Sequence, residues 1–352
     1  MCRPVLLSLT LLTLVTDDGS AGDLARVWEL RISDLTGSKV SDANAHVFSV
    51  GFSPDGRRLA AIVSERQQDR NKQALVTLDV SSPRDSIQIV GYEGPVGEAM
   101  SWSPTGEGIA IPEVFHALGQ PACTLEHTIR AVFYDSDRVA DVQPGFPNSD
   151  ILFFNSHCQP IGSWAIEGRW ELTDGSSDRH LLALSNYMPK RTEIIIVDPL
   201  RKKLVRRWSL AETEGSWPLF ADNGNAVCAI DGTGRRGVAH CWDVNGDHEI
   251  AKTSSGNPHD PMATALRARR VVLSDYGWKI DFERWQTEVG SLERRVVWDF
   301  GTGKEVASWK PRHQDDMAHP ATREAYEFAI SPDGTMVAEG GAGVLTLYRI
   351  EP

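Results

Sequence analysis

The stretch VFSVGFSPDGRRLAAIV, residues 47–63, decides the fold of this 352-residue chain. Apolar residues alternate with other residues on both sides of a Ser-Pro-Asp-Gly turn, and such alternation predicts two half-buried strands. The alternating residues are Phe48, Val50 and Phe52 before the turn and Leu59, Ala61 and Val63 after it. Because Pro followed by Asp-Gly predicts a tight reversal, the stretch is interpreted as a β-hairpin.

The same pattern returns at residues 326–339, YEFAISPDGTMVAE, and in weaker form several times between. A hairpin with one apolar face cannot bury that face alone, so its recurrence predicts stacked copies that share a core. The strand patterns group into seven units. The last unit has only three strands, while a strand at 26–33 belongs to no unit. We therefore predict one closed ring, completed by the N-terminal strand. Residues 64–73 are interpreted as a polar loop and residues 274–293 as an irregular stretch.

Composition narrows the class of partner. The net charge is −12, and the densest basic run is RKKLVRR at 201–207. Nucleic-acid binding requires clustered Lys and Arg side chains that displace counterions, so an acidic chain without a long basic run is a poor candidate. The short basic run falls across a predicted strand-to-strand turn and is interpreted as charge that protects an exposed edge.

The N-terminal residues resemble a secretory signal. Arg3 precedes an apolar run at 5–15, and small residues follow at 19–22. We predict a signal peptide at 1–22, cleaved after Ala21 or Gly22, with residues 23–352 as one domain. Eleven apolar residues are too few to cross a bilayer as a helix. The expected location is the periplasm or the exterior, or the cytoplasm if this segment is instead a buried terminal strand or helix.

The cysteines bear on the same question. Loss of Cys2 with the signal leaves an even number. Cys228 and Cys241 flank the predicted turn at 231–237, and counting outward from its centre places them opposite each other on adjacent antiparallel strands. That separation suits a disulfide, so we predict this bond in an oxidising compartment. A bond between Cys123 and Cys158 follows only by elimination, and free thiols in a cytosolic protein are the alternative.

Several motifs together resemble the WD-repeat β-propellers. They are the Ser-Pro-Asp-Gly turns at 53–56 and 331–334, and the pairs Trp242-Asp243 and Trp298-Asp299, each followed by a turn and a further strand. The resemblance covers nearly the whole chain after the signal. It implies an all-β fold, a seven-bladed propeller of four-stranded antiparallel blades; six blades is the alternative if the second and third units merge. The Gly-His pair that precedes many such repeats is missing, since His46 follows Ala45. Irregular repeats with long insertions and a leader look like bacterial members.

Motifs for chemistry are weak. Residues 232–237, GTGRRG, match the letters of a dinucleotide-binding fingerprint, but they join two predicted strands instead of a strand and a helix. Residues 313–319, HQDDMAH, offer metal-ligand types but lie in a polar loop without helical spacing. No Gly-x-Ser-x-Gly elbow is present. We therefore predict no catalytic residue, no metal site and no cofactor.

The leading hypothesis is a non-catalytic, monomeric propeller that docks a protein or peptide on one ring face. That face carries the loops that lead into each blade's first strand, and the candidate residues lie on these loops or on the neighbouring loops between second and third strands. Exposed Trp, Tyr and Arg side chains form interface hot spots, which motivates the candidate residues. They are His46, Trp170, Trp217, Arg235, Arg236, Tyr276 and Trp278. The alternative hypothesis is a propeller enzyme of hydrolase or lyase type with a polar site at the central channel.

Overall fold

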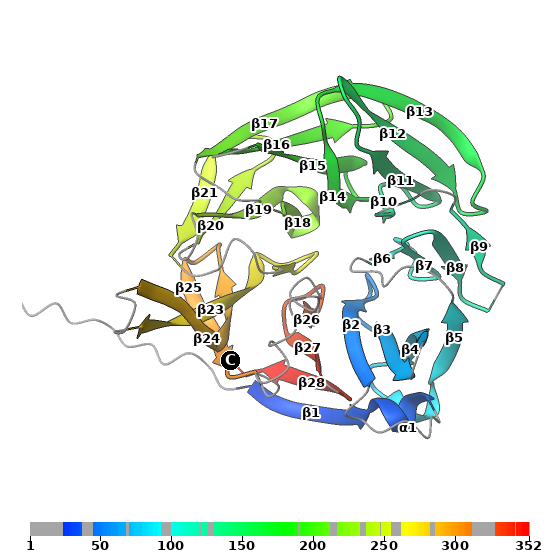
Figure 1. The fold of residues 1–352 in the computed structure, drawn as a ribbon, viewed down its shortest axis with the longest axis vertical. Coiled ribbons are helices and arrows are strands. Elements are labelled where there is room, and N and C mark those ends of the chain that lie inside the picture. Colours follow the sequence, from blue (N-terminus) through cyan, green and yellow to red (C-terminus); the bar gives the residue numbers. More distant parts are fainter. Residues whose placement is uncertain are drawn as a thin grey trace, which may run out of the picture.

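Seven four-stranded antiparallel sheets are arranged as the blades of a ring around a central channel (Figure 1). In this computed structural model the described residues are 24–36, 45–67, 70–92, 100–119, 121–125, 128, 130–188, 191–211, 217–232, 237–246, 248–254, 262–281, 286–311, 328–341 and 343–351. The predicted leader, residues 1–22, lies outside the described residues. In blades 1 to 6 each strand pairs with its sequence neighbour, so the chain completes one of these blades before it begins the next.

The first three blades occupy the N-terminal half of the chain. Blade 1 contains β2 (Ala45–Phe52), β3 (Arg58–Gln67), β4 (Arg70–Asp79) and β5 (Gln88–Tyr92). Blade 2 contains β6 (Ser101–Trp102), β7 (Gly108–Ile111), β8 (Val114–Ala117) and β9 (Cys123–Thr124). Blade 3 contains β10 (Val132–Phe133), β11 (Arg138–Gln143), β12 (Asn148–Asn155) and β13 (Pro160–Glu167). Blades 2 and 3 are separate sheets, so the seven-bladed prediction is confirmed over the six-bladed alternative.

The remaining blades follow in order. Blade 4 contains β14 (Glu171–Ser176), β15 (Leu181–Met188), β16 (Arg191–Asp198) and β17 (Lys203–Ala211). Blade 5 contains β18 (Leu219–Ala221), β19 (Ala226–Asp231), β20 (Val238–Asp243) and β21 (Glu249–Thr253). Blade 6 contains β22 (Ala263–Thr264), β23 (Arg270–Asp281), β24 (Gln286–Asp299) and β25 (Lys304–Trp309). Short helical turns, α1 (Ile32–Thr36), η2 (Pro83–Asp85) and η3 (Asp222–Gly224), lie in connections.

Blade 7 closes the ring with both ends of the chain. It contains β26 (Phe328–Ile330), β27 (Met336–Gly341), β28 (Val344–Ile350) and, as its outermost strand, β1 (Leu24–Arg31). β1 runs antiparallel to β28, with Leu24 opposite Ile350 and Arg31 opposite Val344. The predicted closure by the N-terminal strand is therefore confirmed. It leaves blade 7 with the same strand number as the other blades.

Two segments differ from the prediction. Residues 64–73 extend β3 and β4, which pair as far as Gln67 opposite Arg70. Residues 274–293 belong to β23 and β24, which pair as far as Asp281 opposite Gln286. The interpretations of residues 64–73 as a loop and of residues 274–293 as an irregular stretch were therefore wrong, because polar or interrupted runs still form strands when two of them pair as a hairpin. In Figure 1 the β23–β24 ribbon projects away from the ring.

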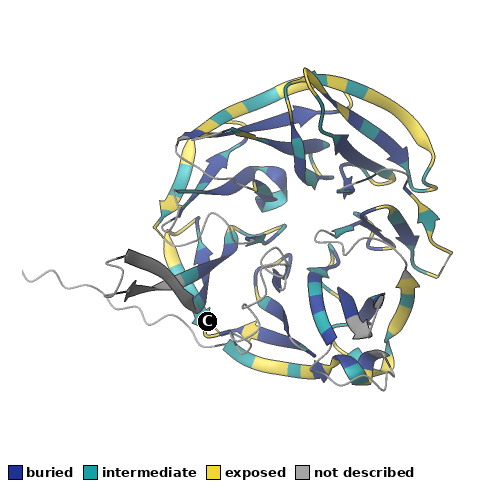
Figure 2. Ribbon diagram, viewed as in Figure 1, coloured by how far each residue is buried: buried dark blue, intermediate teal, exposed yellow. Residues whose placement is uncertain are grey.

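Apolar clusters fill the junctions between blades. Each of the seven junctions has its own cluster of buried side chains, and residues of one strand contribute alternately to the two sides of their blade. Val132, Leu172 and Leu182, for example, belong to the junction of blades 3 and 4, whereas Phe133 and Val139 belong to that of blades 2 and 3. Figure 2 shows buried inner strands and exposed outer strands. The period-2 apolar pattern of the sequence is thus used on both faces of the sheets.

The Ser-Pro turns have one geometry in three consecutive blades, 7, 1 and 2. In each, the serine hydroxyl accepts a hydrogen bond from the backbone N–H five residues later, at 2.9 Å. The serines are Ser53, Ser103 and Ser331, and the glycines three positions after them have φ between 73° and 74°. That left-handed conformation is the reason for glycine there.

The Trp-Asp pairs close the third strands of blades 5 and 6. Asp243 Oδ1 accepts hydrogen bonds from the backbone N–H groups of Asn245 and Gly246. Asp299 Oδ1 accepts from those of Gly301 and Thr302. The pKa of the Asp243 carboxyl lies below its ordinary value because this carboxyl accepts the two backbone hydrogen bonds, and the bond from Gly246 has the largest effect. The aspartates are therefore turn residues, and the tryptophans before them are buried.

Candidate functional site

The ring has two faces, defined here by the connections that each carries. The top face carries the connections between blades and those between second and third strands. The bottom face carries the other hairpin turns. Within the described part of the chain, no helix is long and apolar enough to cross a membrane, and no group of three or more potential metal ligands is present.

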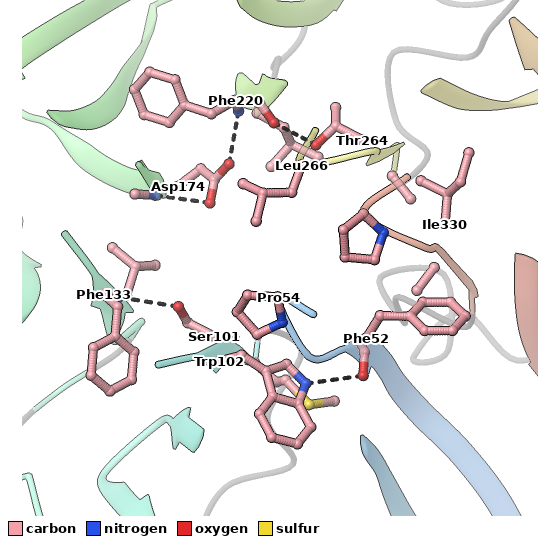
Figure 3. A pocket seen from close by; sticks show the side chains of 18 of the residues that line it. Phe52, Pro54, Ser101, Trp102, Phe133, Asp174, Phe220, Thr264, Leu266 and Ile330 are labelled. Atoms are coloured by element: carbon pink, nitrogen blue, oxygen red, sulfur yellow. Dashed lines mark hydrogen bonds between the residues drawn. The ribbon is translucent and has the colours of Figure 1, made fainter. Parts of the chain in front are cut away.

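The central channel contains a cavity of about 250 Å³ that residues of all seven inner strands line. The lining combines polar and apolar groups, and its apolar residues include Phe52, Trp102, Phe133, Phe220 and Ile330 (Figure 3). Prolines of the Ser-Pro turns line its bottom end. Among the described lining residues, Arg130 and Asp174 are the only ionisable ones.

Side chains around the channel form hydrogen bonds with the backbone of a neighbouring blade. Ser101 Oγ of blade 2 accepts a hydrogen bond from the Phe133 N–H of blade 3 at 3.1 Å. Thr264 Oγ1 of blade 6 donates to the Phe220 carbonyl of blade 5 at 2.6 Å (Figure 3). Innermost strands have one unpaired edge, and these bonds satisfy it where water is limited. The hydroxyl groups of Ser101 and Thr264 therefore have a structural role.

Asp174 forms the corresponding contact between blades 4 and 5. Its Oδ2 accepts from the Phe220 N–H at 2.8 Å and its Oδ1 from the Gly175 N–H at 2.8 Å. Burial raises the pKa of Asp174 to about 6, while the two N–H groups and the charge of Arg130 act in the opposite direction. Both carboxylate oxygens are engaged, which suits a structural acceptor better than a general base.

Arg130 lies beside the channel with an aromatic partner. Its guanidinium carbon is 4.8 Å from the centre of the Trp217 ring, a cation–π distance. Both residues precede the inner strands of their blades, β10 and β18, and so lie toward the top face. Trp217 is 40% exposed. The top end of the channel thus has a cation held against an exposed aromatic ring.

Blades 3, 4 and 5 each have one exposed aromatic side chain on the top face. Among the large apolar side chains that are exposed in the described residues, the aromatic ones are Phe146 (94%), Tyr187 (54%) and Trp217 (40%). Phe146 lies between β11 and β12, Tyr187 near the end of β15, and Trp217 just before β18. All three positions belong to the top face by their place in the blade. The exposed aliphatic residues lie elsewhere, for example Leu200 and Leu204 at the β16–β17 turn and on the outer strand β17.

The structure separates the predicted site residues. Trp217 is exposed on the expected face, and His46 is half-buried at the start of β2, with its ring 6.2 Å from that of Phe48. Trp170 is 3% exposed and packs in the core between blades 3 and 4, so it does not contribute to a surface. Its indole N–H donates to the Glu167 carbonyl at 2.7 Å.

The other candidates are less fully described. Tyr276 and Trp278 lie in β23, beyond the blade, and their side chains are outside the described part; Arg235 and Arg236 are outside it entirely. Sequence reasoning missed Phe146, Tyr187 and Arg130. Only the Pro-Gly-Phe-Pro run at 144–147 could have indicated Phe146 as a loop residue.

Both cysteine pairs form disulfides. Cys228 bonds Cys241 inside blade 5, with the Cα atoms 4.1 Å apart. Cys123 bonds Cys158 with a Cα separation of 6.0 Å, and this bond joins β9 of blade 2 to the β12–β13 turn of blade 3. Blade 2 has the shortest strands, with two residues in β6 and in β9, so the second bond fixes the edge of the smallest blade.

Comparison with known proteins identifies the fold and nothing finer. No family model matches the chain, and no curated protein matches it by sequence. A chain of the mitotic checkpoint complex superposes with a TM-score of 0.59 at 11% identity, over 93% of this chain and 96% of that one. The Cps50 (Swd1) β-propeller domain of Myceliophteria thermophila gives 0.58 at 12% identity, over 87% and 97%.

A third similar structure is an enzyme. Prolyl oligopeptidase B from Galerina marginata, solved with a hydrolysis and macrocyclization substrate, gives a TM-score of 0.51 at 12% identity, over 86% of this chain and 47% of that one. At such identities the likeness extends to the fold alone. The chain is a seven-bladed propeller that is structurally similar to WD-repeat proteins.

Proposed function

We propose that this chain is a non-catalytic binding propeller that docks a protein or peptide on its top face, across blades 3, 4 and 5. The observation that carries the proposal is the set of exposed aromatic side chains on that face, Phe146, Tyr187 and Trp217. Aromatic residues are enriched at interfaces because they remove a large apolar area from water at a small cost in side-chain entropy. An isolated side chain as exposed as Phe146 has no role in packing.

The proposed face extends to other predicted residues. β23 and β24 leave the top side of blade 6 and carry Tyr276 and Trp278, while Arg235 and Arg236 fall between β19 and β20, whose adjoining ends lie on the same face. His46 begins the inner strand of blade 1. These residues are proposed as peripheral contacts, and Trp170 is withdrawn because it is buried.

An exported location is part of the proposal. Two disulfides form in the structure, and such bonds persist in oxidising compartments such as the periplasm or the exterior. The leader-like residues 1–22 support the same location.

The enzymatic alternative has less support. The described channel lining provides two ionisable side chains, and the carboxylate of Asp174 is engaged by two backbone N–H groups. Hydrolytic chemistry requires a nucleophile or activated water with a base oriented toward it. The polar groups of the channel are better explained by hydrogen bonds between blades than by catalysis.

The test is a cross-linked pull-down with the full chain as bait. Phe146→Ala/Tyr187→Ala/Trp217→Ala removes the exposed aromatic side chains of the top face, and Leu200→Ala/Leu204→Ala, the control variant, removes two exposed apolar side chains at the outer edge of blade 4. We expect a reproducible prey that the face variant loses and the edge variant keeps. A prey retained by the face variant, or lost equally from both, would contradict the proposed surface. Thermal unfolding of each bait checks its folding.

A further inference from the structure

The two disulfides of the chain differ in their access to solvent. Cys228 and Cys241 are 0% exposed and lie opposite each other on paired strands of one blade. Cys123 and Cys158 are half-buried, and the residues on either side of each cysteine in the sequence are exposed. Exchange with an external thiol requires its thiolate to reach one sulfur atom of the bond, so the rate depends on access. The Cys123–Cys158 bond is therefore the more accessible of the two.

The turn that carries Cys158 is fixed by hydrogen bonds that do not involve the disulfide. Asn155 Oδ1 accepts from the backbone N–H groups of His157 and Gln159, at 3.0 Å each. The Asn155 carbonyl accepts from the Cys158 N–H at 3.0 Å, and the Asn155 N–H donates to the Gln159 carbonyl at 3.0 Å. Because side-chain and backbone bonds of this kind stabilise a turn locally, we expect the Cys158 thiol to stay in place after reduction.

The strand that carries Cys123 is held mainly by the residue that follows it. β9 contains two residues, Cys123 at its first position, and pairs with β8 at two positions. Leu125, directly after β9, is 0% exposed and packs in the core between blades 2 and 3. Its N–H donates to the Glu113 carbonyl at 2.8 Å. Reduction would therefore free the start of β9, while Leu125 keeps the Cys123 thiol near its partner.

We propose that Cys123–Cys158 is a site of reversible thiol–disulfide exchange and that its substrate is a dithiol. One thiolate of the dithiol attacks a sulfur atom of the bond and forms a mixed disulfide, and the other cysteine leaves as a thiolate that takes up a proton. The second thiolate of the dithiol then attacks the mixed disulfide. This step releases the remaining cysteine, which is protonated in turn, and closes a disulfide in the reductant. The protein gains two electrons and two protons, and the dithiol loses them.

Exchange changes how blade 2 is joined to the ring. The bond links β9, the outer strand of blade 2, to the β12–β13 turn of blade 3 on the bottom face. In the reduced protein the start of β9 is free to leave β8, where Phe115 has Cys123 as its cross-strand partner. A strand with so few backbone bonds opens at a low free energy, so the change is local. The proposed docking residues lie on the top face, and this inference does not rest on that function.

The experiment compares the two disulfides in the folded, full-length protein. The probe is dithiothreitol, a dithiol, and each cysteine that it frees is labelled with N-ethylmaleimide and quantified by mass spectrometry. A Cys2→Ser background removes the fifth cysteine. We expect the Cys123–Cys158 bond to be reduced at least about 100-fold faster than Cys228–Cys241, because the buried bond reacts only when its blade opens. Circular dichroism should stay unchanged, and removal of dithiothreitol under air should restore the same pair.

Hydrogen exchange locates the effect of reduction. The backbone amides of residues 122–124 should exchange at least about tenfold faster after the bond opens, while those of β19 and β20 stay unchanged. Cys123→Ser/Cys158→Ser should show the faster exchange without any reductant. Cys228→Ser/Cys241→Ser, the matched control, should keep slow exchange at residues 122–124 until dithiothreitol is added.

Three results would overturn the proposal. The first is reduction of both bonds at one rate, equal to the rate of unfolding, which would mean that Cys123–Cys158 opens only in the unfolded chain. The second is loss of the circular dichroism signal as this bond opens, and the third is reoxidation to other cysteine pairs. The wild-type comparison of the two bonds decides the question even if a serine variant fails to fold.

Discussion

Two arcs of the ring hold their bottom faces together by different means. In blades 7, 1 and 2 the Ser-Pro turns pack against each other: a Cβ at Gly56 would be 3.5 Å from Pro332, and one at Gly106 would be 3.4 Å from Arg58 Nη2 and 3.8 Å from Pro54. In blades 4, 5 and 6 arginines bridge the turns.

Polar bonds hold the second arc. Arg179 donates to the side-chain oxygens of Asn225 and Asn245 at 2.6 Å each, and Arg269 pairs with Asp222 at 3.0 Å. One arc thus repeats a motif that sequence reveals. The other reaches the same blade geometry through contacts between residues far apart in the chain, and it carries two of the three exposed aromatic residues. The same blade geometry is therefore compatible with more than one kind of bottom turn, although the sequence shows only the Ser-Pro turn as a repeated motif.

The largest effect is expected for the Cys123–Cys158 disulfide, which joins blade 2 to blade 3, between the two arcs. Cys123→Ala/Cys158→Ala should lower the free energy of unfolding by about 4 kcal/mol, and Cys228→Ala/Cys241→Ala by about 3 kcal/mol, from the lengths of the loops that they close. Urea denaturation measures both values. Mild reduction without denaturant, followed by alkylation and mass spectrometry, should label positions 123 and 158 first, because Cys228 and Cys241 are fully buried. Labelling in the opposite order would refute this assignment.

The difference between the two arcs is tested by measuring how salt concentration changes the stability of one variant in each arc. Arg269→Ala should cost about 0.5–1 kcal/mol through the lost ion pair with Asp222, and Gly56→Ala about 1–2 kcal/mol through a left-handed φ of 74°. About 1 M salt screens the ion pair of Arg269, so the cost of Arg269→Ala should shrink while that of Gly56→Ala stays. Equal salt dependence of the two variants in thermal unfolding would remove the distinction between the arcs.

Asp174 predicts a smaller, pH-dependent effect. Burial raises its pKa to about 6, above the ordinary 3.8. Its contribution to stability is therefore fully present below pH 3.8 and is lost as the pH rises through about 6. Relative to Asp174→Asn, the wild-type protein should gain about 1 kcal/mol of unfolding free energy between pH 7 and pH 5. Parallel pH profiles of the two proteins would show that this carboxyl titrates normally.

The smallest stability effect is expected for Phe146. Because this side chain is 94% exposed, Phe146→Ala should change the free energy of unfolding by no more than about 0.5 kcal/mol while it weakens partner capture. Calorimetry measures the first quantity and the pull-down the second. Val132→Ala, at a buried position of the same blade, serves as the contrasting variant. A large loss of stability from Phe146→Ala would assign this residue to packing.

Local patterns predicted most of the fold. The alternation around Ser53 and Ser331, the Trp-Asp pairs and the strand left over near Trp28 were sufficient for seven blades and their closure. The ribbon beyond Ser274 was missed, because its strands lack a third partner and their bulges interrupt the alternation at Tyr276. Pairing over such a stretch depends on the opposite strand, which a one-strand pattern does not contain.

The site was less predictable than the fold. Trp170 and Trp217 each precede an inner strand, yet one is buried and the other exposed. What separates them is the neighbouring blade: Trp170 packs in the core between blades 3 and 4, and Trp217 meets Arg130, 87 positions away by residue number. The proximity of Arg130 and Asp174 depends in the same way on contacts between blades. Phe146 lies in a loop, where the alternation of apolar residues that predicts strands gives no information.

The pairing of β1 with β28 has a consequence for the order of events during synthesis. Leu24 emerges from the ribosome among the first residues of the ring, yet its partner Ile350 is among the last. Until that moment blade 7 is incomplete, and an open seam with an unpaired strand persists while six blades are already made. Contacts of such long sequence separation form late and slowly. Until β1 pairs with β28, the edge of blade 7 is open to pairing with other chains, and closure of the ring removes that edge.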